Sequence, residues 1–332
     1  MKRHEATEGR LPSRRQFLTL GMGAFVVAAV PLAVAQRRAL VRRTLPVMGT
    51  IAELGVVHRD PRYAHGAIDA AFAELTAVER VMSRFDPRSE IGQANLYAAC
   101  EPVIVSAPTA AVIVAAAHWA TATDGGFDPC LGGAVALWDV AHRQAPPAAS
   151  QVRRYADRRL YRALELDRRG GAAIVRFHEA DIALDLGGIA KGYAVDRAVG
   201  TLRAWGIRDA LVNVGGDLYA LGVSADGDPW EIGIRSPADA SRLTGSIRVT
   251  DRAIATSGDY EQFFDHAGRR YHHLMDPTTG APRRAETHSL TIAADDCMSA
   301  DAAATALFGR SPADTRATLA RLAPHAEVVQ PG

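Results

Sequence analysis

Cysteine is scarce in this chain: there are three in 332 residues, Cys100, Cys130 and Cys297. Their odd number and wide spacing match neither a zinc-binding pattern nor the disulfide framework of a small secreted domain. The sequence therefore indicates neither a metal site built from cysteines nor a fold stabilised by several disulfides. A single bridge, such as one between Cys100 and Cys297, is left open.

The chain also lacks a block of basic residues. It has 38 Lys and Arg against 37 Asp and Glu, which gives a formal net charge of +1 at pH 7. Proteins that bind nucleic acid usually concentrate positive charge in a patch or stripe. We therefore expect no nucleic acid partner.

Two common nucleotide-binding patterns are absent as well. The segment GGFDPCLGGAVALW (125–138) is rich in glycine but matches neither the Rossmann fingerprint nor the P-loop. The shorter segment GGIAKG (187–192) fails both patterns too. The familiar nucleotide-binding folds are therefore disfavoured.

The first 35 residues have the features of an export signal. A twin-arginine pair, Arg14 and Arg15, precedes an apolar run that ends in Ala33-Val34-Ala35, a small-x-small cleavage pattern. The alternative is a membrane anchor, but the run contains two glycines and a proline and is short for a span of about 20 apolar residues. We predict a cleaved twin-arginine signal over 1–35, a periplasmic location, and one mature domain over 36–332 without a stable membrane span.

Hydrophobic periodicity predicts an α+β fold. Helical spacing is found over 66–82, 109–126 and 299–310, and a short basic helix is expected over 151–163 after a loop at 145–150. Strand-like runs lie at 172–178, 181–186, 210–214, 217–223, 230–235, 253–256, 270–275 and 288–293. Because only 181–214 has a strand-helix-strand form, we predict a largely antiparallel sheet core flanked by helices.

The segment DIALDLGGIAKGYAVDRAV (181–199) joins an expected strand to a helix through Gly187-Gly188. Asp185 precedes this turn, and Lys191 lies one turn into the helix. A helix N-terminus offers unpaired N–H groups and a positive dipole end to an anion, which suits a phosphate group. The plainer interpretation is a tight strand-to-helix connection, because Gly-Gly turns are common.

Asp301 and Thr305 are four residues apart in the expected helix over 299–310, so their oxygens project from one face. Two hard oxygen ligands together with a substrate phosphate suit Mg²⁺. The alternative is local: Asp301 favours the helix N-terminus, and Thr305 can bond back to the carbonyl four residues earlier.

His272 and His273 are neighbours in an expected strand that ends at the turn Asp276-Pro277-Thr278-Thr279-Gly280. Adjacent strand residues face opposite sides, so one of the two histidines faces the core or a site. Such a histidine is either a hydrogen-bonded core residue or a general base with a pKa near 6.5 if unperturbed.

Eight stretches, in sequence order, resemble the motifs of the ApbE family, the FAD:protein FMN transferases. They are LPVMGT (45–50), VMSRFDPRSEIGQAN (81–95), GGFDPCLGGAVALW (125–138), DLGGIAKGYAVD (185–196), LVNVGGDLYALG (211–222), ATSGDYEQFF (255–264), HHLMDPTTGAP (272–282) and ADAAATAL (300–307). The resemblance covers almost the whole predicted mature chain.

The resemblance implies an enzyme that binds FAD with Mg²⁺ at its pyrophosphate, transfers FMN to a Thr or Ser of an acceptor flavoprotein, and releases AMP. It puts His273 at the position of the histidine that family members need for transfer, which implies a base for the acceptor hydroxyl. The implied metal positions are Gly188 (through its carbonyl), Asp301 and Thr305, and the implied FAD contacts are Met48, Phe85, Phe127, Asp128, Asp185, Lys191 and Leu274.

The chain departs from the family motifs in three places. Cys130 stands where Thr is usual, Gly133-Ala134 replaces Gly-Pro, and Ala304 stands where some members have another acidic ligand. Two other functions stay open: an FAD pyrophosphatase, in which water replaces the acceptor hydroxyl, and a periplasmic flavin-binding protein without activity. His273 and the metal positions argue against a pure carrier.

Overall fold

The computed structural model describes residues 25–27, 38–236, 239 and 242–329. The predicted signal over 1–35 lies outside the described residues, apart from a short strand, β1 (Phe25–Val27), which pairs with β9 (Trp230–Arg235). Within the described part of the chain, none of the helices has the length and apolar content needed to cross a membrane.

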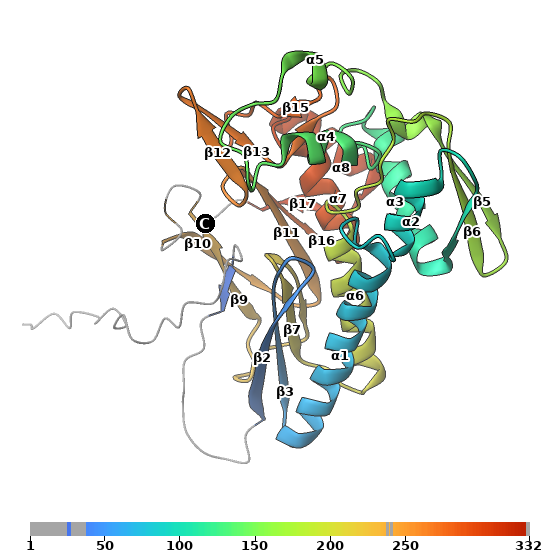
Figure 1. The fold of residues 1–332 in the computed structure, drawn as a ribbon. Coiled ribbons are helices and arrows are strands. Elements are labelled where there is room, and N and C mark those ends of the chain that lie inside the picture. Colours follow the sequence, from blue (N-terminus) through green and yellow to red (C-terminus); the bar gives the residue numbers. More distant parts are fainter. Residues whose placement is uncertain (1–24, 28–37, 237–238, 240–241, 330–332) are drawn as a thin grey trace, which may run out of the picture.

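Seven strands form the central sheet, and every neighbouring pair in it is antiparallel (Figure 1). Their spatial order is β17 (Glu327–Val328), β16 (Ser289–Ala294), β11 (Arg252–Gly258), β8 (Asp217–Leu221), β7 (Ala210–Val214), β3 (Thr50–His58) and β2 (Ala39–Val47). The predicted α+β fold with a largely antiparallel sheet is confirmed.

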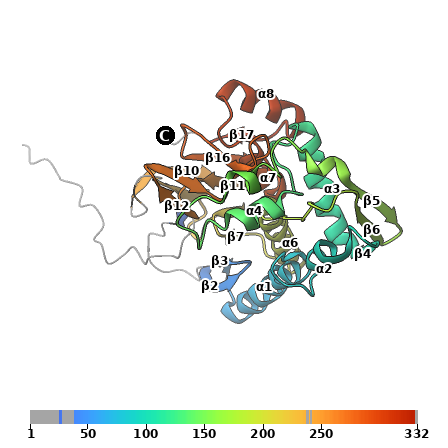
Figure 2. The same cartoon turned by 45° about the horizontal axis from the view of Figure 1, so that its top comes forward.

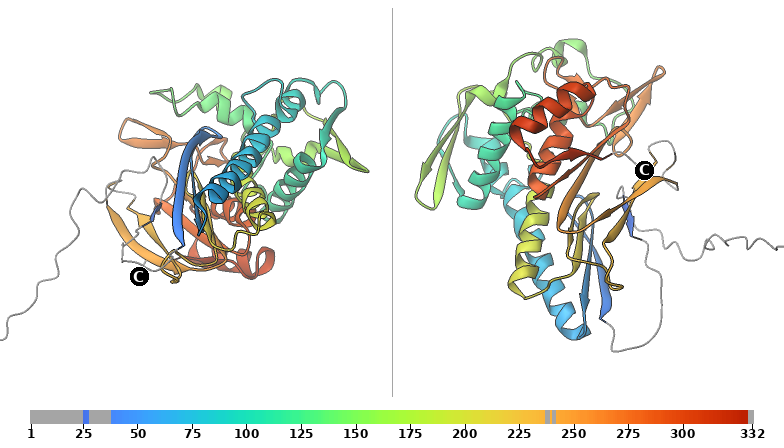
Figure 3. Two further views of the ribbon diagram at one scale, coloured as in Figure 1. Left: turned by 90° about the horizontal axis from the view of Figure 1, so that it is seen from below. Right: turned by 180° about the vertical axis from the view of Figure 1, so that it is seen from behind.

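Both faces of this sheet are covered. One face packs against α1 (Pro61–Met82), α6 (Ala190–Ala204) and α7 (Cys297–Leu307), which are seen from below and from behind in Figure 3. The other face packs against β9 and β10 (Leu243–Val249), where Trp230, Ile232 and Ile234 contact apolar residues of the central strands. All residues of β7 and β8 are therefore buried.

A second group of elements lies outside the seven-stranded sheet (Figure 2). Its helices are α2 (Glu90–Tyr97), α3 (Ala107–Ala122), α4 (Gly132–Trp138), α5 (Ala149–Val152), η1 (Leu160–Ala163) and α8 (Pro312–Leu322). Its strands are β4 (Val103–Ser106), β6 (Ala172–Phe177) and β5 (Leu164–Arg169) in one sheet, and the hairpins β12 (Phe263–His266)–β13 (Arg269–His272) and β14 (Met275–Asp276)–β15 (Ala281–Pro282). These hairpins bring the histidine pair towards α7.

Local signals explain where several elements begin. The helix predicted over 66–82 starts earlier, at Pro61, because the Asp60 carboxylate caps the amides of Arg62 and Tyr63. The β2–β3 hairpin turns at Met48-Gly49, where both residues have positive φ, 54° and 68°. This hairpin carries Met48 and was not predicted from the sequence.

Two of the elements predicted from the sequence are not found in the structure. The segment 151–163 is not a helix: α5 ends at Val152 and η1 begins at Leu160, and the positive φ of Asp157 and Arg159 breaks the chain between them. The segment 181–186 is not a strand but an extended stretch with one isolated parallel bridge, Leu131 to Ala183. It lies along 129–132 instead of joining the sheet, so the unit over 181–214 is an extended segment, a helix and a strand.

The remaining expected strands are confirmed within a few residues, as β6, β7, β8, β9, β11, β13 with β14, and β16. The three cysteines are all free; Cys100 is exposed, whereas Cys130 and Cys297 are buried. The bridge between Cys100 and Cys297 that the sequence left open is therefore absent from the described residues.

We predict that Gly192→Ala destabilises the protein, because α6 and α7 cross closely at this residue. A Cβ there would lie 2.2 Å from the Cys297 carbonyl oxygen and 2.8 Å from the Met298 Cα, both backbone atoms. The expected loss is about 1–3 kcal/mol in the free energy of unfolding, measured by urea titration. The matched control is Gly200→Ala in the same helix. No atom lies within 4 Å of its Cβ position, and we expect a gain of about 0.5–1 kcal/mol. Equal effects at both sites would contradict the close crossing.

Candidate functional site

Lys191 forms the centre of a buried charge cluster. It lies in the first turn of α6, and its Nζ contacts a carboxylate oxygen of Asp217, the first residue of β8. Both carboxylate oxygens of Asp301, on α7, lie 3.4 Å from the same Nζ. Asp217 and Asp301 are 2% and 3% exposed, so the cluster joins three elements inside the protein.

The cluster keeps Lys191 charged. Burial opposes the ammonium form, but the carboxylates of Asp217 and Asp301 outweigh it and raise the pKa of Lys191 above its usual value. The two buried acids oppose each other's ionisation, because burial and the neighbouring Asp301 carboxylate raise the pKa of Asp217. Such a site suits an additional cation.

The three predicted metal positions converge. The amide N of Gly192 donates to the Asp301 carboxylate over 3.0 Å, which fixes this side chain. Thr305 lies one turn later in α7, and its hydroxyl is 3.3 Å from the hydroxyl of Ser257 instead of bonding back along the helix. A Cβ on Gly188 would lie 2.9 Å from the Thr305 hydroxyl, so the Gly188 backbone lies beside it.

The donor set fits Mg²⁺ in its chemistry, because it offers a carboxylate, a hydroxyl and a backbone carbonyl, all oxygens. Among the described residues, no group of three or more His, Cys, Asp or Glu side chains is placed to hold a metal ion. A cation at this site would therefore depend on Thr305, on backbone oxygen and on ligand oxygens in addition to Asp301.

The two neighbouring histidines differ in their surroundings. His272 is 3% exposed; its Nε2 donates to the carbonyl of Arg283 over 2.9 Å, and its Nδ1 accepts from the amide of Leu274 over 3.2 Å. His273 has no such arrangement: its Nδ1 is enclosed and has no hydrogen-bond partner. His272 is thus the hydrogen-bonded core histidine, and His273 faces the other way, as expected for adjacent residues.

His273 is neutral at physiological pH. Burial disfavours the imidazolium, and the nearby His272 and the Lys191 ammonium act in the same direction, which lowers the pKa of His273 to about 4. The usual value near 6.5 that the sequence suggested does not hold in this environment. A neutral imidazole with a free nitrogen can accept a proton from a hydroxyl placed against it.

Asp185 and Phe85 lie together at the rim. The Asp185 carboxylate accepts from the amide of Gly187 over 2.8 Å and forms an ion pair with Arg84 at 3.0 Å. The Arg84 guanidinium stacks 4.1 Å from the centroid of the Phe85 ring, which is 79% exposed. The exposed ring therefore leaves a face open for stacking against another flat group.

The other residues predicted to contact the cofactor lie further from the charge cluster around Lys191 in their bonding. Phe127 is buried, and its ring lies 3.1 Å from a Cβ position on Gly188. Asp128 uses both carboxylate oxygens for the amides of Cys130 and Tyr161, and burial raises its pKa to about 6. Met48 donates its amide to Glu79, and Leu274 is buried beside His272. Among the described residues, Met48, Asp128 and Leu274 make no hydrogen bond or ion pair with the charge cluster.

Sequence reasoning missed Asp217, Arg84 and Ser257 as site residues. Asp217 and Ser257 lie inside the family-like stretches 211–222 and 255–264. Each is a polar residue next to a glycine, and this was the sequence feature that could have marked them as site residues. Their partners lie up to 48 residues away, however, and no spacing rule links them. Arg84, next to Phe85, could have been matched to Asp185 only with the fold known.

Known proteins are similar in sequence to this chain. The model of the ApbE family matches residues 48–330. A Treponema pallidum protein named FAD:protein FMN transferase is 34% identical over 278 residues, covering 79% of this chain and 76% of the relative. A protein of the same name from Klebsiella pneumoniae is 35% identical over 251 residues, covering 74% and 77%.

Solved structures have a similar fold. The ApbE protein from Thermotoga maritima superposes with a TM-score of 0.78 at 30% identity, covering 88% of this chain and 94% of that one. The flavin transferase ApbE from Vibrio cholerae gives 0.73 at 30% identity, covering 86% and 91%. These similarities identify the chain as a transferase enzyme. The chain belongs to the ApbE family.

We predict that His273 titrates far below an ordinary histidine in the ligand-free protein. Because its pKa is lowered to about 4, the neutral form should already be complete at pH 6.5 and should decline only as the pH falls through about 4. The measurement is an NMR titration of the imidazole nitrogens, with His273→Gln to assign the resonance. A midpoint near 6.5 would contradict the enclosed, cation-facing environment.

Proposed function

We propose that the chain catalyses the Mg²⁺-dependent transfer of the FMN moiety of FAD to a Thr or Ser hydroxyl of an acceptor flavoprotein, with release of AMP. The observation that carries the proposal is the neutral His273, whose Nδ1 is enclosed without a partner next to the cluster of Lys191 and Asp301. The name shared by the Treponema and Klebsiella relatives supports the same reaction.

The residues around Gly187-Gly188 suit FAD. The start of α6 and the Lys191 ammonium provide positive potential for its pyrophosphate. Phe127 and Leu274 supply buried apolar surface, and the exposed Phe85 ring at the rim suits stacking against a flat aromatic group. Met48, Asp128 and Asp185 are assigned to FAD by the family resemblance.

Asp301, Thr305 and the Gly188 carbonyl would hold Mg²⁺. When bound, the ion neutralises negative charge on phosphate oxygens while the bond to the leaving group breaks. Asp301 is held for this role by the Gly192 amide and by Lys191.

His273 would act as the general base. A Thr or Ser hydroxyl is a poor nucleophile until its proton is removed. As the hydroxyl oxygen bonds to the FMN phosphorus, the imidazole takes the hydroxyl proton, and the P–O bond to AMP breaks. The low pKa of His273 keeps the imidazole unprotonated and ready at neutral pH.

An FAD pyrophosphatase would use the same groups with water as the acceptor. A flavin carrier without activity would need neither a base nor a metal site. Incubation with FAD, Mg²⁺ and a candidate acceptor, followed by a denaturing gel, separates these functions. We expect flavin fluorescence in the acceptor band; free FMN with an unlabelled acceptor would favour the pyrophosphatase, and intact FAD the carrier.

We also propose that the enzyme works in the periplasm after twin-arginine export, and we predict that Arg14→Lys with Arg15→Lys keeps the folded precursor in the cytoplasm. Cell fractionation and immunoblotting measure this, with a periplasmic marker exported by another route as the control. Normal delivery of the double variant to the periplasm would contradict the proposed route.

For the metal, we predict that Asp301→Asn abolishes transfer while the protein stays folded, because the site loses its charged ligand, whereas the side-chain oxygen keeps its volume and can still accept from the Gly192 amide. EDTA should have the same effect on the wild type, and added Mg²⁺ should reverse it. The control is Asp295→Ala, which removes an exposed carboxylate paired with Arg252. Full activity in excess chelator would rule out the metal assignment.

For the base, we predict that His273→Ala lowers transfer by about 10²–10⁴-fold and leaves FAD affinity unchanged. His272→Ala should affect stability instead, because it breaks the bonds to Arg283 and Leu274. FAD titration and single-turnover labelling on each variant give the comparison. A parallel fall of binding and transfer in His273→Ala would mean that this residue packs and does not act as a base.

A further inference from the structure

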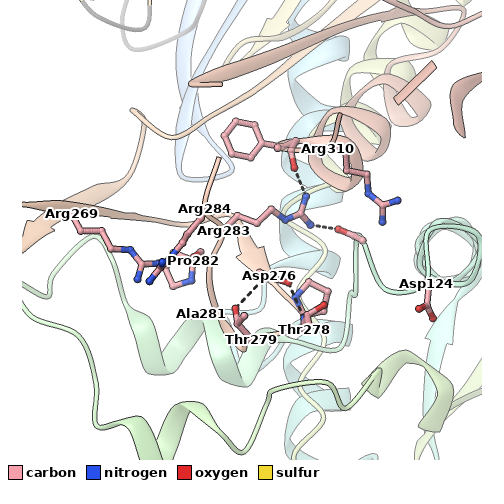
Figure 4. A pocket seen from close by; sticks show the side chains of 14 residues that line it. Asp124, Arg269, Asp276, Thr278, Thr279, Ala281, Pro282, Arg283, Arg284 and Arg310 are labelled. Atoms are coloured by element: carbon pink, nitrogen blue, oxygen red, sulfur yellow. Dashed lines mark hydrogen bonds between the residues drawn. The ribbon is translucent and has the colours of Figure 1, made fainter. Parts of the chain in front are cut away.

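A separate cavity of about 570 Å³ lies beside the site (Figure 4). Its walls come from the loop after α3, the β14–β15 hairpin with its flanking residues, and the end of α7. Its charged side chains are Asp124, Arg269, Asp276, Arg283, Arg284 and Arg310. Four arginines thus face two aspartates in a cavity that none of the predicted FAD or metal residues lines.

The cavity lining carries an excess of positive charge, because its four arginines outnumber Asp124, which acts on Arg310, and Asp276, which acts on Arg283. Asp124 is paired with Arg159 and Arg162, which do not line the cavity. Asp276 accepts hydrogen bonds from Thr278 and Thr279 of its own turn. The lining arginines therefore retain net positive charge that an anionic ligand could offset.

Three of the arginines have N–H donors that are not used in hydrogen bonds. Arg284 is exposed and has no hydrogen bond or ion pair among the described residues. Arg269 donates one weak bond to the Pro282 carbonyl at 3.4 Å, and Arg310 one to the Thr123 carbonyl at 2.7 Å. Each guanidinium has five N–H donors, so most remain available. Figure 4 shows Arg269 and Arg284 at one end of the cavity and Arg310 at the other.

Arg283 connects the cavity to the site. Its guanidinium donates only to backbone carbonyls, those of Met275, Thr305, Ala306, Phe308 and Gly126. Burial lowers its pKa to about 10, which leaves it charged at neutral pH. Thr305 is a metal position, and Gly126 precedes Phe127. The cavity and the site therefore share one wall.

The cavity also lies next to the proposed base in the chain. The amide of Arg283 donates to the carbonyl of Leu274 over 2.9 Å, and Leu274 follows His273 directly. The residues that line the cavity are thus joined to the strand that carries His273, and an extended segment seated between Arg284 and Arg310 would lie along the wall that Arg283 shares with Thr305. Arginine pairs carboxylates in bidentate geometry, which orients as well as binds.

We propose that this cavity docks an acidic segment of the acceptor protein and so aligns the acceptor hydroxyl with the site. The proposal rests on the proposed flavin transfer and adds what selects the protein substrate. Aspartate or glutamate side chains near the modified Thr or Ser would pair with Arg284, Arg269 and Arg310. A nucleotide phosphate offers the same chemistry to these arginines, so the test includes it.

The test is a binding measurement on the full mature protein without turnover. Two fluorescent 12-residue peptides carry one threonine and differ only in three aspartates against three asparagines. We expect the aspartate peptide to bind about tenfold or more tightly, by anisotropy at low salt, as one charge-assisted pair would provide. Arg284→Glu should remove this preference, and the control Arg62→Glu, an exposed arginine outside the cavity, should leave it unchanged.

Competition identifies the source of the anion. If the proposal holds, neither FAD nor inorganic pyrophosphate at 1 mM (about physiological substrate concentration) displaces the aspartate peptide, and Arg284→Glu keeps wild-type FAD affinity. Displacement by pyrophosphate, or a loss of FAD affinity in Arg284→Glu, would assign the cavity to the nucleotide and overturn the proposal, as would equal binding of both peptides. Arg284-dependent binding of the aspartate peptide, together with no flavin transfer to an acceptor protein in the gel assay, would instead refute the proposed function alone.

Discussion

The buried contact of Lys191 with Asp217 and Asp301 is the interaction on which the rest of the site depends. It ties α6, β8 and α7 together at the point where the Gly192 backbone meets α7. Burying these charges is costly unless each has a partner and a hydrogen bond, and the Gly192 amide supplies one such bond to Asp301. The lysine that helps to hold the Asp301 carboxylate is also the cation that we propose for the pyrophosphate of FAD.

Environment separates chemically identical groups in this fold. His272 has both ring nitrogens bonded within the hairpin, whereas the adjacent His273 has an enclosed, unpartnered Nδ1 and a pKa lowered to about 4. The arginines divide in the same way. The Arg283 guanidinium donates to backbone carbonyls in the wall of the cavity, whereas the exposed Arg284 guanidinium is free to bind a ligand. Packing therefore decides which side chains are structural and which are free to bind.

Much of this could be predicted from the sequence where the signal is local. The spacing of Asp301 and Thr305, the alternation of His272 and His273, and the Asp276–Gly280 turn all depend on neighbours within a few residues, and the structure has each of them. The basic helix over 151–163 failed because single residues with positive φ, Asp157 and Arg159, interrupt it. The contact of Lys191 with Asp301 spans 110 positions in sequence, and only tertiary packing could reveal it.

We propose that these residues transfer FMN to a protein hydroxyl instead of releasing it to water. The most direct measurement is the stoichiometry of one reaction that contains enzyme, FAD, Mg²⁺ and acceptor, with the acceptor weighed by intact-protein mass spectrometry and AMP quantified in the filtrate. We expect the acceptor to gain the mass of a phosphoester-linked FMN and one AMP to appear for each flavin attached. AMP that accumulates together with free FMN, while the acceptor keeps its original mass, would contradict the claim.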